Sequence, residues 1–196
     1  APVDNKTVAE LSLQGVTAAT RVYDGGTTAT LAGALGGLVA GDTVTLSLAG
    51  QFADRNVGAG KTVNYTAALG GADVANYSLA VNAGSVLAGI TPATLSYVAA
   101  PASATAGQAL PTLVGTVSGF VAGETLAGAT TGTLLWTTPA TSNSPAGTYA
   151  ITGSGLAAAN YVFVQAAGNA TALTLASPAT SDPATTATTV VTTTAL

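Results

Sequence analysis

Residues 43–48 of the chain read Thr-Val-Thr-Leu-Ser-Leu, an unbroken alternation of hydroxyl and apolar side chains. Residues 62–66, Thr-Val-Asn-Tyr-Thr, alternate in the same way. A period of two puts all the apolar side chains of an extended strand on one face, so both segments are predicted to be strands with one face in a core. Residues 161–164, Tyr-Val-Phe-Val, are apolar on both faces and predict a more deeply buried strand.

Helical patterns are weak along the whole chain. Thr and Val are abundant, 24 glycines interrupt most windows, and apolar residues do not recur at intervals of three and four. A single helical turn is the alternative at residues 41–45 and 123–127, but Gly-Asp-Thr and Gly-Glu-Thr there are more typical of tight turns between strands. The predicted fold class is therefore all-β.

The chain resembles itself at a shift of about 82 to 86 residues. Residues 37–43, Gly-Leu-Val-Ala-Gly-Asp-Thr, fall on residues 119–125, Gly-Phe-Val-Ala-Gly-Glu-Thr. Further along, Asn76-Tyr77 falls on Asn160-Tyr161, in the same order. We therefore expect Tyr77 and Tyr161 to occupy equivalent positions in two repeats, as should Val39 and Val121.

Two small β-domains in tandem follow from these matches, over residues 11–91 and 92–176, with residues 1–10 as an N-terminal extension. Each is expected to be an Ig-like sandwich or of β-grasp type. The junction is placed near Ile90 to Leu95, where Pro92 restricts its neighbour to extended conformations. The competing architecture is one β-solenoid through residue 92, but solenoid coils repeat at about 20 to 30 residues.

The tail, residues 177–196, is rich in Thr, Ala and Pro, with Asp182 as its one charged residue. This composition is typical of a linker. Its last part, residues 188–196, is nevertheless β-prone, and Val190-Val191 between threonines would suit a strand added to an open sheet edge. If the tail is ordered, we expect a strand paired with the second domain or with a neighbouring chain.

Composition excludes several classes of function. The chain has no His, Cys or Met, so it lacks Ser-His-Asp and Cys-His catalysis, ordinary zinc sites and haem ligands, and no cofactor or metal is expected. Its net charge is −4, and four cations cannot build a nucleic-acid-binding surface: Lys6, Arg21, Arg55 and Lys61. Apolar runs are too short to span a membrane.

Carboxylates in the first half are the candidate chemical groups: Asp24, Asp42, Asp54 and Asp73. Calcium takes oxygen ligands, and glycoside hydrolysis needs only two carboxylates. Their spacing matches neither a dense calcium loop nor a recognisable active-site frame, so we assign no catalytic, cofactor-binding or metal-binding residue.

Other polar and aromatic positions have structural interpretations. Tyr23-Asp24-Gly25 predicts a turn in which Asp accepts backbone N–H bonds and Gly supplies positive φ. Asn76-Tyr77 and Asn160-Tyr161 are predicted corners, with Asn satisfying backbone groups and Tyr covering the core with its hydroxyl toward water. Trp136 is expected in a core or half-core strand position. Four N-x-[ST] triplets give weak glycosylation signals: Asn5, Asn64, Asn76 and Asn169.

Residues 21–31, Arg-Val-Tyr-Asp-Gly-Gly-Thr-Thr-Ala-Thr-Leu, with Gly41-Asp42 and Asn76-Tyr77 further on, resemble the YDG repeat of bacterial haemagglutinin-like exoproteins. Residues 90–95, Ile-Thr-Pro-Ala-Thr-Leu, and the segments after them resemble the MBG repeat found beside YDG repeats. Where that repeat usually has Tyr-Gly, this chain has Ala106-Gly107.

The resemblance implies a non-enzymatic stalk or adhesion region of a large secreted surface protein of the filamentous-haemagglutinin, two-partner-secretion type. Such proteins serve attachment, aggregation or biofilm matrix outside the cell. The implied partners are a glycan or protein of the host cell or matrix, or other copies of the chain. The alternative is a subunit of a homopolymeric extracellular filament assembled by β-strand donation, which the β-prone tail and the nearly uncharged second half favour.

Overall fold

A computed structural model of the chain describes residues 7–121 and 123–179. Strands make up 54% of the described residues and helix 7%, which confirms the all-β fold class. All strand pairs lie either within residues 9–91 or within residues 93–176, so the described chain forms two β-repeats in tandem instead of one solenoid.

The first repeat contains two sheets, with strand orders β4-β1-β7 and β2-β8-β6-β5-β3. A short 3₁₀ helix, Val74–Asn76, leads into β7. The strands are β1 (Ala9–Ala18), β2 (Arg21–Val22), β3 (Thr28–Ala29), β4 (Leu31–Gly36), β5 (Thr45–Phe52), β6 (Gly58–Gly70), β7 (Tyr77–Leu79) and β8 (Ala83–Thr91).

The second repeat has sheets of order β11-β9-β15, β10-β16-β13 and β12-β14. Its helical segments are α1 (Leu126–Ala129) and a 3₁₀ helix, Ala167–Thr171. The strands are β9 (Ala93–Ala99), β10 (Ala102–Thr105), β11 (Gly115–Ser118), β12 (Thr131–Thr137), β13 (Gly147–Tyr149), β14 (Thr152–Ala157), β15 (Tyr161–Gln165) and β16 (Leu173–Ala176).

Each repeat contains an equivalent sheet with one parallel strand pair. In the first, β1 pairs parallel with β7 so that Ala9 lies opposite Tyr77. In the second, β9 pairs parallel with β15 so that Ala93 lies opposite Tyr161. Two residues beyond each alanine, Leu11 and Leu95 are both fully buried. Alternation along these strands therefore places one face in the core, and a β-rich fold of several small sheets fits the sandwich expectation.

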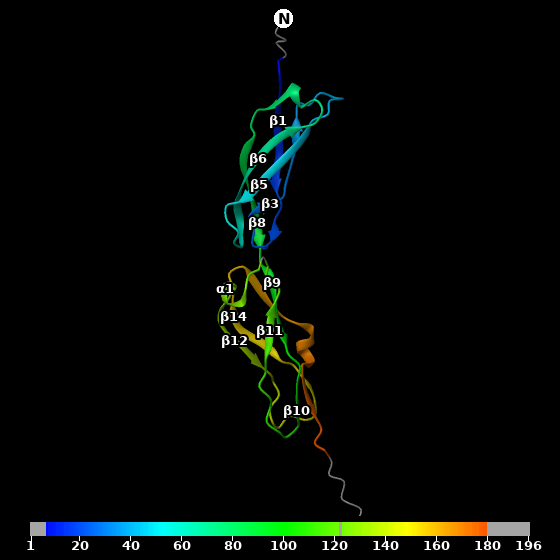
Figure 1. Ribbon diagram of the computed structural model, residues 1–196, viewed down its shortest axis with the longest axis vertical. Coiled ribbons are helices and arrows are strands. Elements are labelled where there is room, and N and C mark those ends of the chain that lie inside the picture. Colours follow the sequence, from blue (N-terminus) through cyan, green and yellow to red (C-terminus); the bar gives the residue numbers. More distant parts are fainter. Residues whose placement is uncertain (1–6, 122, 180–196) are drawn as a thin grey trace, which may run out of the picture.

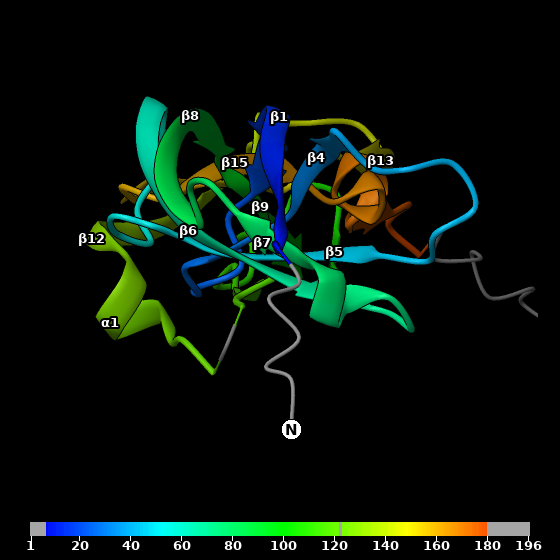
Figure 2. The ribbon, with the colours of Figure 1, turned by 90° about the horizontal axis from the view of Figure 1, so that it is seen from above.

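The repeats lie end to end along the long axis of the molecule (Figure 1). β8 of the first repeat leads through Pro92 directly into β9 of the second. Seen from above in Figure 2, the strands of the two repeats lie over one another along that axis. Only one residue separates the two strands, so the junction leaves little slack in the backbone.

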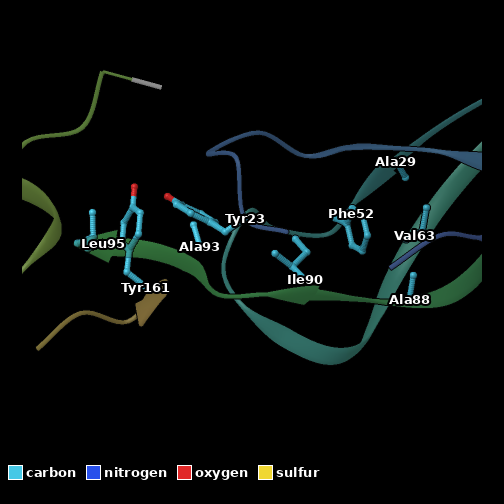
Figure 3. Close-up of a cluster of buried hydrophobic side chains, with 9 residues drawn as sticks. All are labelled: Tyr23, Ala29, Phe52, Val63, Ala88, Ile90, Ala93, Leu95 and Tyr161. Atoms are coloured by element: carbon cyan, nitrogen blue, oxygen red, sulfur yellow. The ribbon is translucent and has the colours of Figure 1, made fainter. Parts of the chain in front are cut away.

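One hydrophobic cluster runs through this junction (Figure 3). Phe52 and Ile90 enter it from the first repeat, and Leu95 and Tyr161 enter it from the second. A separate cluster around Ile151 and Leu173 fills the far part of the second repeat. The cores of the two repeats are thus continuous where they meet, which is unusual for domains joined only by a linker.

Two expectations from the sequence need correction. β15 is not deeply buried, because Val162 and Val164 are 48% and 44% exposed and only its other face packs on the core. A helical turn follows the Gly-Glu-Thr of residues 123–125, where the Thr125 hydroxyl accepts a hydrogen bond from Gly128 N–H and caps α1. Residues 41–45 contain no helix.

The tail prediction for residues 188–196 lies outside the described residues. In the described part of the chain, no helix has the length and apolar character needed to cross a membrane.

Candidate functional site

The same tight turn presents a carboxylate in each repeat. Asp42 N–H donates to Val39 C=O at 3.2 Å, and Glu124 N–H donates to Val121 C=O at 2.9 Å. The residue before each acid is a glycine with positive φ, 101° at Gly41 and 73° at Gly123. Residues with a side chain rarely adopt this backbone conformation, so the turn requires glycine there. The turn places the following acidic side chain against its own repeat.

A tyrosine closes each turn in the same way. The Tyr77 hydroxyl donates to Asp42 Oδ2 at 2.6 Å and accepts from Val39 N–H at 3.3 Å. The Tyr161 hydroxyl donates to Glu124 Oε2 at 2.6 Å and accepts from Val121 N–H at 3.1 Å. The aligned tyrosines and valines therefore make matching contacts, as the internal repeat predicts. The expectation that these hydroxyls face water was wrong.

Glu124 differs from Asp42 in holding a second tyrosine, which comes from the other repeat. The Tyr23 hydroxyl donates to Glu124 Oε1 at 2.6 Å. Arg55, also in the first repeat, places its Nη1 atom 4.0 Å from the same oxygen. One carboxylate in the second repeat is thus held by a hydroxyl from each repeat.

These contacts shift the pKa values of the three groups. Hydrogen bonds from Tyr161 and Tyr23 lower the pKa of Glu124, because they stabilise the charged carboxylate. Burial raises the pKa of both tyrosines, and the hydrogen bond to Glu124 raises it further. The junction therefore favours an ionised Glu124 between two neutral tyrosines.

Aromatic packing surrounds this carboxylate. The rings of Tyr23 and Tyr161 meet edge to face, with centroids 5.4 Å apart. Figure 3 shows their hydroxyl oxygens lying close together on one side of the core. The ring of Phe120 contacts Tyr161 at 5.9 Å, also edge to face. Such pairs add to the free energy of simple burial and fix the relative orientation of the rings.

Amide contacts add a second set of hydrogen bonds across the junction. Asn160 Oδ1 accepts from Val57 N–H at 2.9 Å, and its Nδ2 donates to Asn56 Oδ1 at 3.1 Å. The prediction that Asn160 satisfies backbone groups is confirmed, although the N–H it binds belongs to the other repeat. Together with Glu124, this side chain fixes one repeat against its neighbour.

The structure does not bring the candidate carboxylates together. Asp24 pairs with Arg21, Asp42 binds Tyr77, Asp54 pairs with Lys61, and Asp73 accepts from Thr43 N–H. Among the described residues there is no group of three or more acidic side chains that could hold a metal ion. Each carboxylate instead completes a local turn or ion pair.

The turn at Tyr23-Asp24-Gly25 forms as predicted. Asp24 Oδ1 accepts from Gly26 N–H at 2.8 Å, and Gly25 has φ of 80°. Tyr23 itself is only 2% exposed, because the second repeat covers it. Its role at the junction could not be read from the turn alone.

Trp136 and Asn169 take structural positions. Trp136 is half-buried in β12 and meets Tyr97 edge to face at 6.1 Å, which confirms the half-core prediction. Asn169 is 4% exposed and binds Tyr97 C=O and Ala99 N–H, so its triplet is not an accessible glycosylation site. Asn64 is exposed, and Asn5 lies outside the described residues.

The molecule thus belongs to the class of tandem all-β repeat proteins. Hydrogen bonds and a shared hydrophobic cluster form a joint between its repeats. Residues 6–84 match the family model of the YDG domain, and residues 95–171 match that of the MBG domain (YGX type). The chain therefore carries a YDG domain followed by an MBG domain. No curated protein and no solved structure gives a significant match.

Proposed function

We propose that the chain is a non-enzymatic structural module, a spacer in the adhesion region of a large secreted bacterial surface protein, of the filamentous-haemagglutinin type exported by two-partner secretion. Its work is mechanical: it holds a binding region of the same protein away from the cell surface. Attachment, aggregation and biofilm matrix formation are the processes it serves. The presence of YDG and MBG domains supports this proposal.

The observation that carries the proposal is the joint at Glu124. A spacer must resist bending where its modules meet, and flexible linkers do not provide that resistance. Here Tyr23, Asn56 and Val57 of the first repeat bind side chains of the second. The core continues through the joint, so bending would expose apolar surface as well as break hydrogen bonds.

Small-angle X-ray scattering of the purified chain tests the spacer function. We expect one narrow distribution of distances between the repeats, as for a rod. The double variant Glu124→Ala, Asn160→Ala should broaden it, whereas Asp42→Ala, which removes the matching acid inside the first repeat, should leave it unchanged. A broad distribution in the unaltered chain would contradict the proposal.

Binding measurements separate a spacer from a direct adhesin. The chain immobilised on a surface should retain no member of a panel of host-type glycans. Saturable retention of one glycan, abolished by a substitution in this chain, would place the adhesive site in these repeats instead.

A homopolymeric filament is the second candidate, and the edge of β5 favours it. β5 pairs with β6 over its whole length, but β3 covers only Gly50 and Gln51 on the other side. In the described residues no strand pairs with Thr45–Ala49 on that side. A groove of about 690 Å³ is lined by residues of β3, β5 and β6, and only Leu48 and Ala49 of the unpaired stretch belong to it. Such an edge accepts an added strand.

Negative-stain images and size-exclusion chromatography distinguish the two candidates. A filament subunit would polymerise with residues 177–196 present and stay monomeric when they are removed. The spacer proposal expects a monomeric rod in both cases.

A further inference from the structure

The N-terminal end of the first repeat exposes the surface that the second repeat buries at the joint. Leu38 and Val39, in the tight turn, are 38% and 58% exposed. Their counterparts Phe120 and Val121 are half-buried against the shared core. The two turns have the same backbone hydrogen bond and the same tyrosine contact. The difference in exposure of their apolar side chains therefore comes from the neighbouring repeat that covers the second turn.

At this end of the first repeat, a described hydrogen bond reaches one of the two carboxylate oxygens of Asp42. At the joint, one oxygen of Glu124 binds Tyr161 and the other binds Tyr23 of the covering repeat. In the first repeat, Asp42 Oδ2 binds Tyr77, and the described residues supply no hydrogen-bond donor to Oδ1. The acceptor that receives the neighbour's hydroxyl at the joint therefore has a counterpart at the N-terminal end to which no described residue donates.

We infer that the surface formed by Leu38, Val39 and Asp42, beside the buried Tyr77, is a docking site for the C-terminal end of another β-repeat, one that carries a tyrosine at the position of Tyr23. The incoming hydroxyl binds Asp42 Oδ1 and the incoming aromatic ring covers Val39. This inference deepens the proposed spacer function and rests on it, since it extends the same joint by one module.

The second repeat of this chain does not have the required end. Tyr23 N–H donates to Thr91 C=O at 2.8 Å, at the end of β8. The matching bond in the second repeat runs from Ala106 N–H to Ala176 C=O at 2.9 Å, at the end of β16. Ala106 therefore occupies the position that Tyr23 has in the first repeat. Its side chain is a methyl group, which cannot donate a hydrogen bond. The partner is accordingly a tyrosine-bearing repeat and not a second copy of this chain.

An extended chain tests the inference. Residues 7–92 are joined directly to residues 9–196, so that Pro92 precedes Ala9 as it precedes Ala93 in the parent. We expect hydrogen exchange at Val39 N–H of the second-placed copy to slow at least tenfold relative to the parent chain. We also expect ¹⁵N relaxation to give one rotational correlation time for all three repeats.

Tyr23→Ala in the added copy alone is the matched control, because it reproduces the residue found at Ala106. It should restore parent exchange at Val39 and release the added repeat, which remains folded. Independent tumbling of the unaltered added repeat, with Val39 exchange unchanged, would overturn the inference. If the two parent repeats still tumble together in that case, the spacer function survives while the docking site does not.

A second variant keeps the inference testable if the extended chain does not fold. Ala106→Tyr supplies the missing hydroxyl at the C-terminal end, so copies should associate head to tail at concentrations where the parent is monomeric. Adding Val39→Asp should abolish that association. Sedimentation equilibrium measures the mass, and either a monomeric Ala106→Tyr chain or an equally associated parent would count against the docking site.

Discussion

The two repeats use one local structure for two purposes. In each, a glycine turn presents an acid to a tyrosine hydroxyl at 2.6 Å. In the first repeat that acid, Asp42, closes the repeat on itself. In the second, Glu124 also takes the Tyr23 hydroxyl and so ties two repeats together. A carboxylate has two acceptor oxygens, so it can convert an internal turn contact into a joint between modules.

The other ends of the repeats differ in a complementary way. At the end of the first repeat that faces the joint lies Tyr23, which is buried there. The second repeat has Ala106 at the equivalent position. The second repeat can therefore receive a neighbour but offers no tyrosine to a following one. The joint is directional, because a tyrosine at the C-terminal end of one repeat binds a carboxylate at the N-terminal end of the next. The pair Tyr23 and Glu124 forms such a joint in this chain.

The largest expected effect comes from the shared core. Ile90 is 2% exposed within the cluster that crosses the joint, so Ile90→Ala should cost about 3 kcal/mol and uncouple the two repeats. Leu175, at the matching end of β16 and also 2% exposed, lies in the separate cluster. Leu175→Ala should cost a similar amount but destabilise the second repeat alone. Residue-resolved hydrogen exchange checks this, and equal responses of both repeats to both variants would mean that the two clusters do not differ in coupling the repeats.

Removing the two acids should have unequal effects. Glu124→Ala leaves two tyrosine hydroxyls without their acceptor and should destabilise the chain by about 3 kcal/mol, from two charge-assisted hydrogen bonds. Asp42→Ala removes one such bond and should cost about half as much. Urea unfolding of the two variants measures the difference. An Asp42→Ala effect as large as that of Glu124→Ala would show that Tyr23 adds nothing to the joint.

Acid should weaken the joint through Glu124. The folded-state pKa of this carboxyl is lowered from its ordinary value of 4.5, so its stabilising contribution is present above that value and is lost as the pH falls through the lowered pKa. The pKa values of the two tyrosines facing it, Tyr23 and Tyr161, are raised from 10, so these groups stay neutral over this range, and Arg55 is the cation beside it.

Glu124→Gln is the control for this pH effect. The difference in melting temperature between the unaltered chain and this variant should shrink between pH 7 and pH 3, a range of about four units around the carboxyl pKa. The acid-sensitive contacts of Asp24 and Asp54 are present in both proteins and cancel in the difference. A constant difference over this range would mean that Glu124 does not titrate at the joint.

The smallest expected effect is that of the amide contact. Asn160→Ala removes the acceptor of Val57 N–H and should cost about 1 kcal/mol. The exposed Asn64 on β6 is the matched control, and Asn64→Ala should change the free energy of unfolding by less than about 0.5 kcal/mol. The Val57 amide shift in an NMR spectrum reports the loss directly, and an unchanged shift in Asn160→Ala would remove this residue from the joint.

The fold was predictable because its signals are local. Alternation at residues 43–48 and 62–66 requires only neighbouring residues, and both segments lie largely within β5 and β6. The repeat was predictable because Val39 and Val121 precede their acids at the same spacing. The burial of β15 was overestimated because a sequence does not show which face of an apolar strand lies at the surface.

The joint was not predictable because its partners are distant in the chain. Tyr23 and Glu124 are separated by 101 residues, and the local signal at Tyr23 indicates only a turn. The Tyr77 and Tyr161 hydroxyls were assigned to water because their carboxylate partners lie in turns 35 and 37 residues earlier. The one available signal was the tyrosine present at position 23 and replaced by Ala106 in the other repeat, and its meaning depends on the register of β2 and β10.

Residual dipolar couplings of the intact chain in a weakly aligning medium test whether the joint makes one rigid body of two repeats. If Glu124 and the continuous core hold the repeats as described, the couplings of residues 9–91 and 93–176 will fit a single alignment tensor in the orientation of Figure 1. Two tensors of different magnitude would mean that the repeats move independently about Pro92 and that the joint is not rigid.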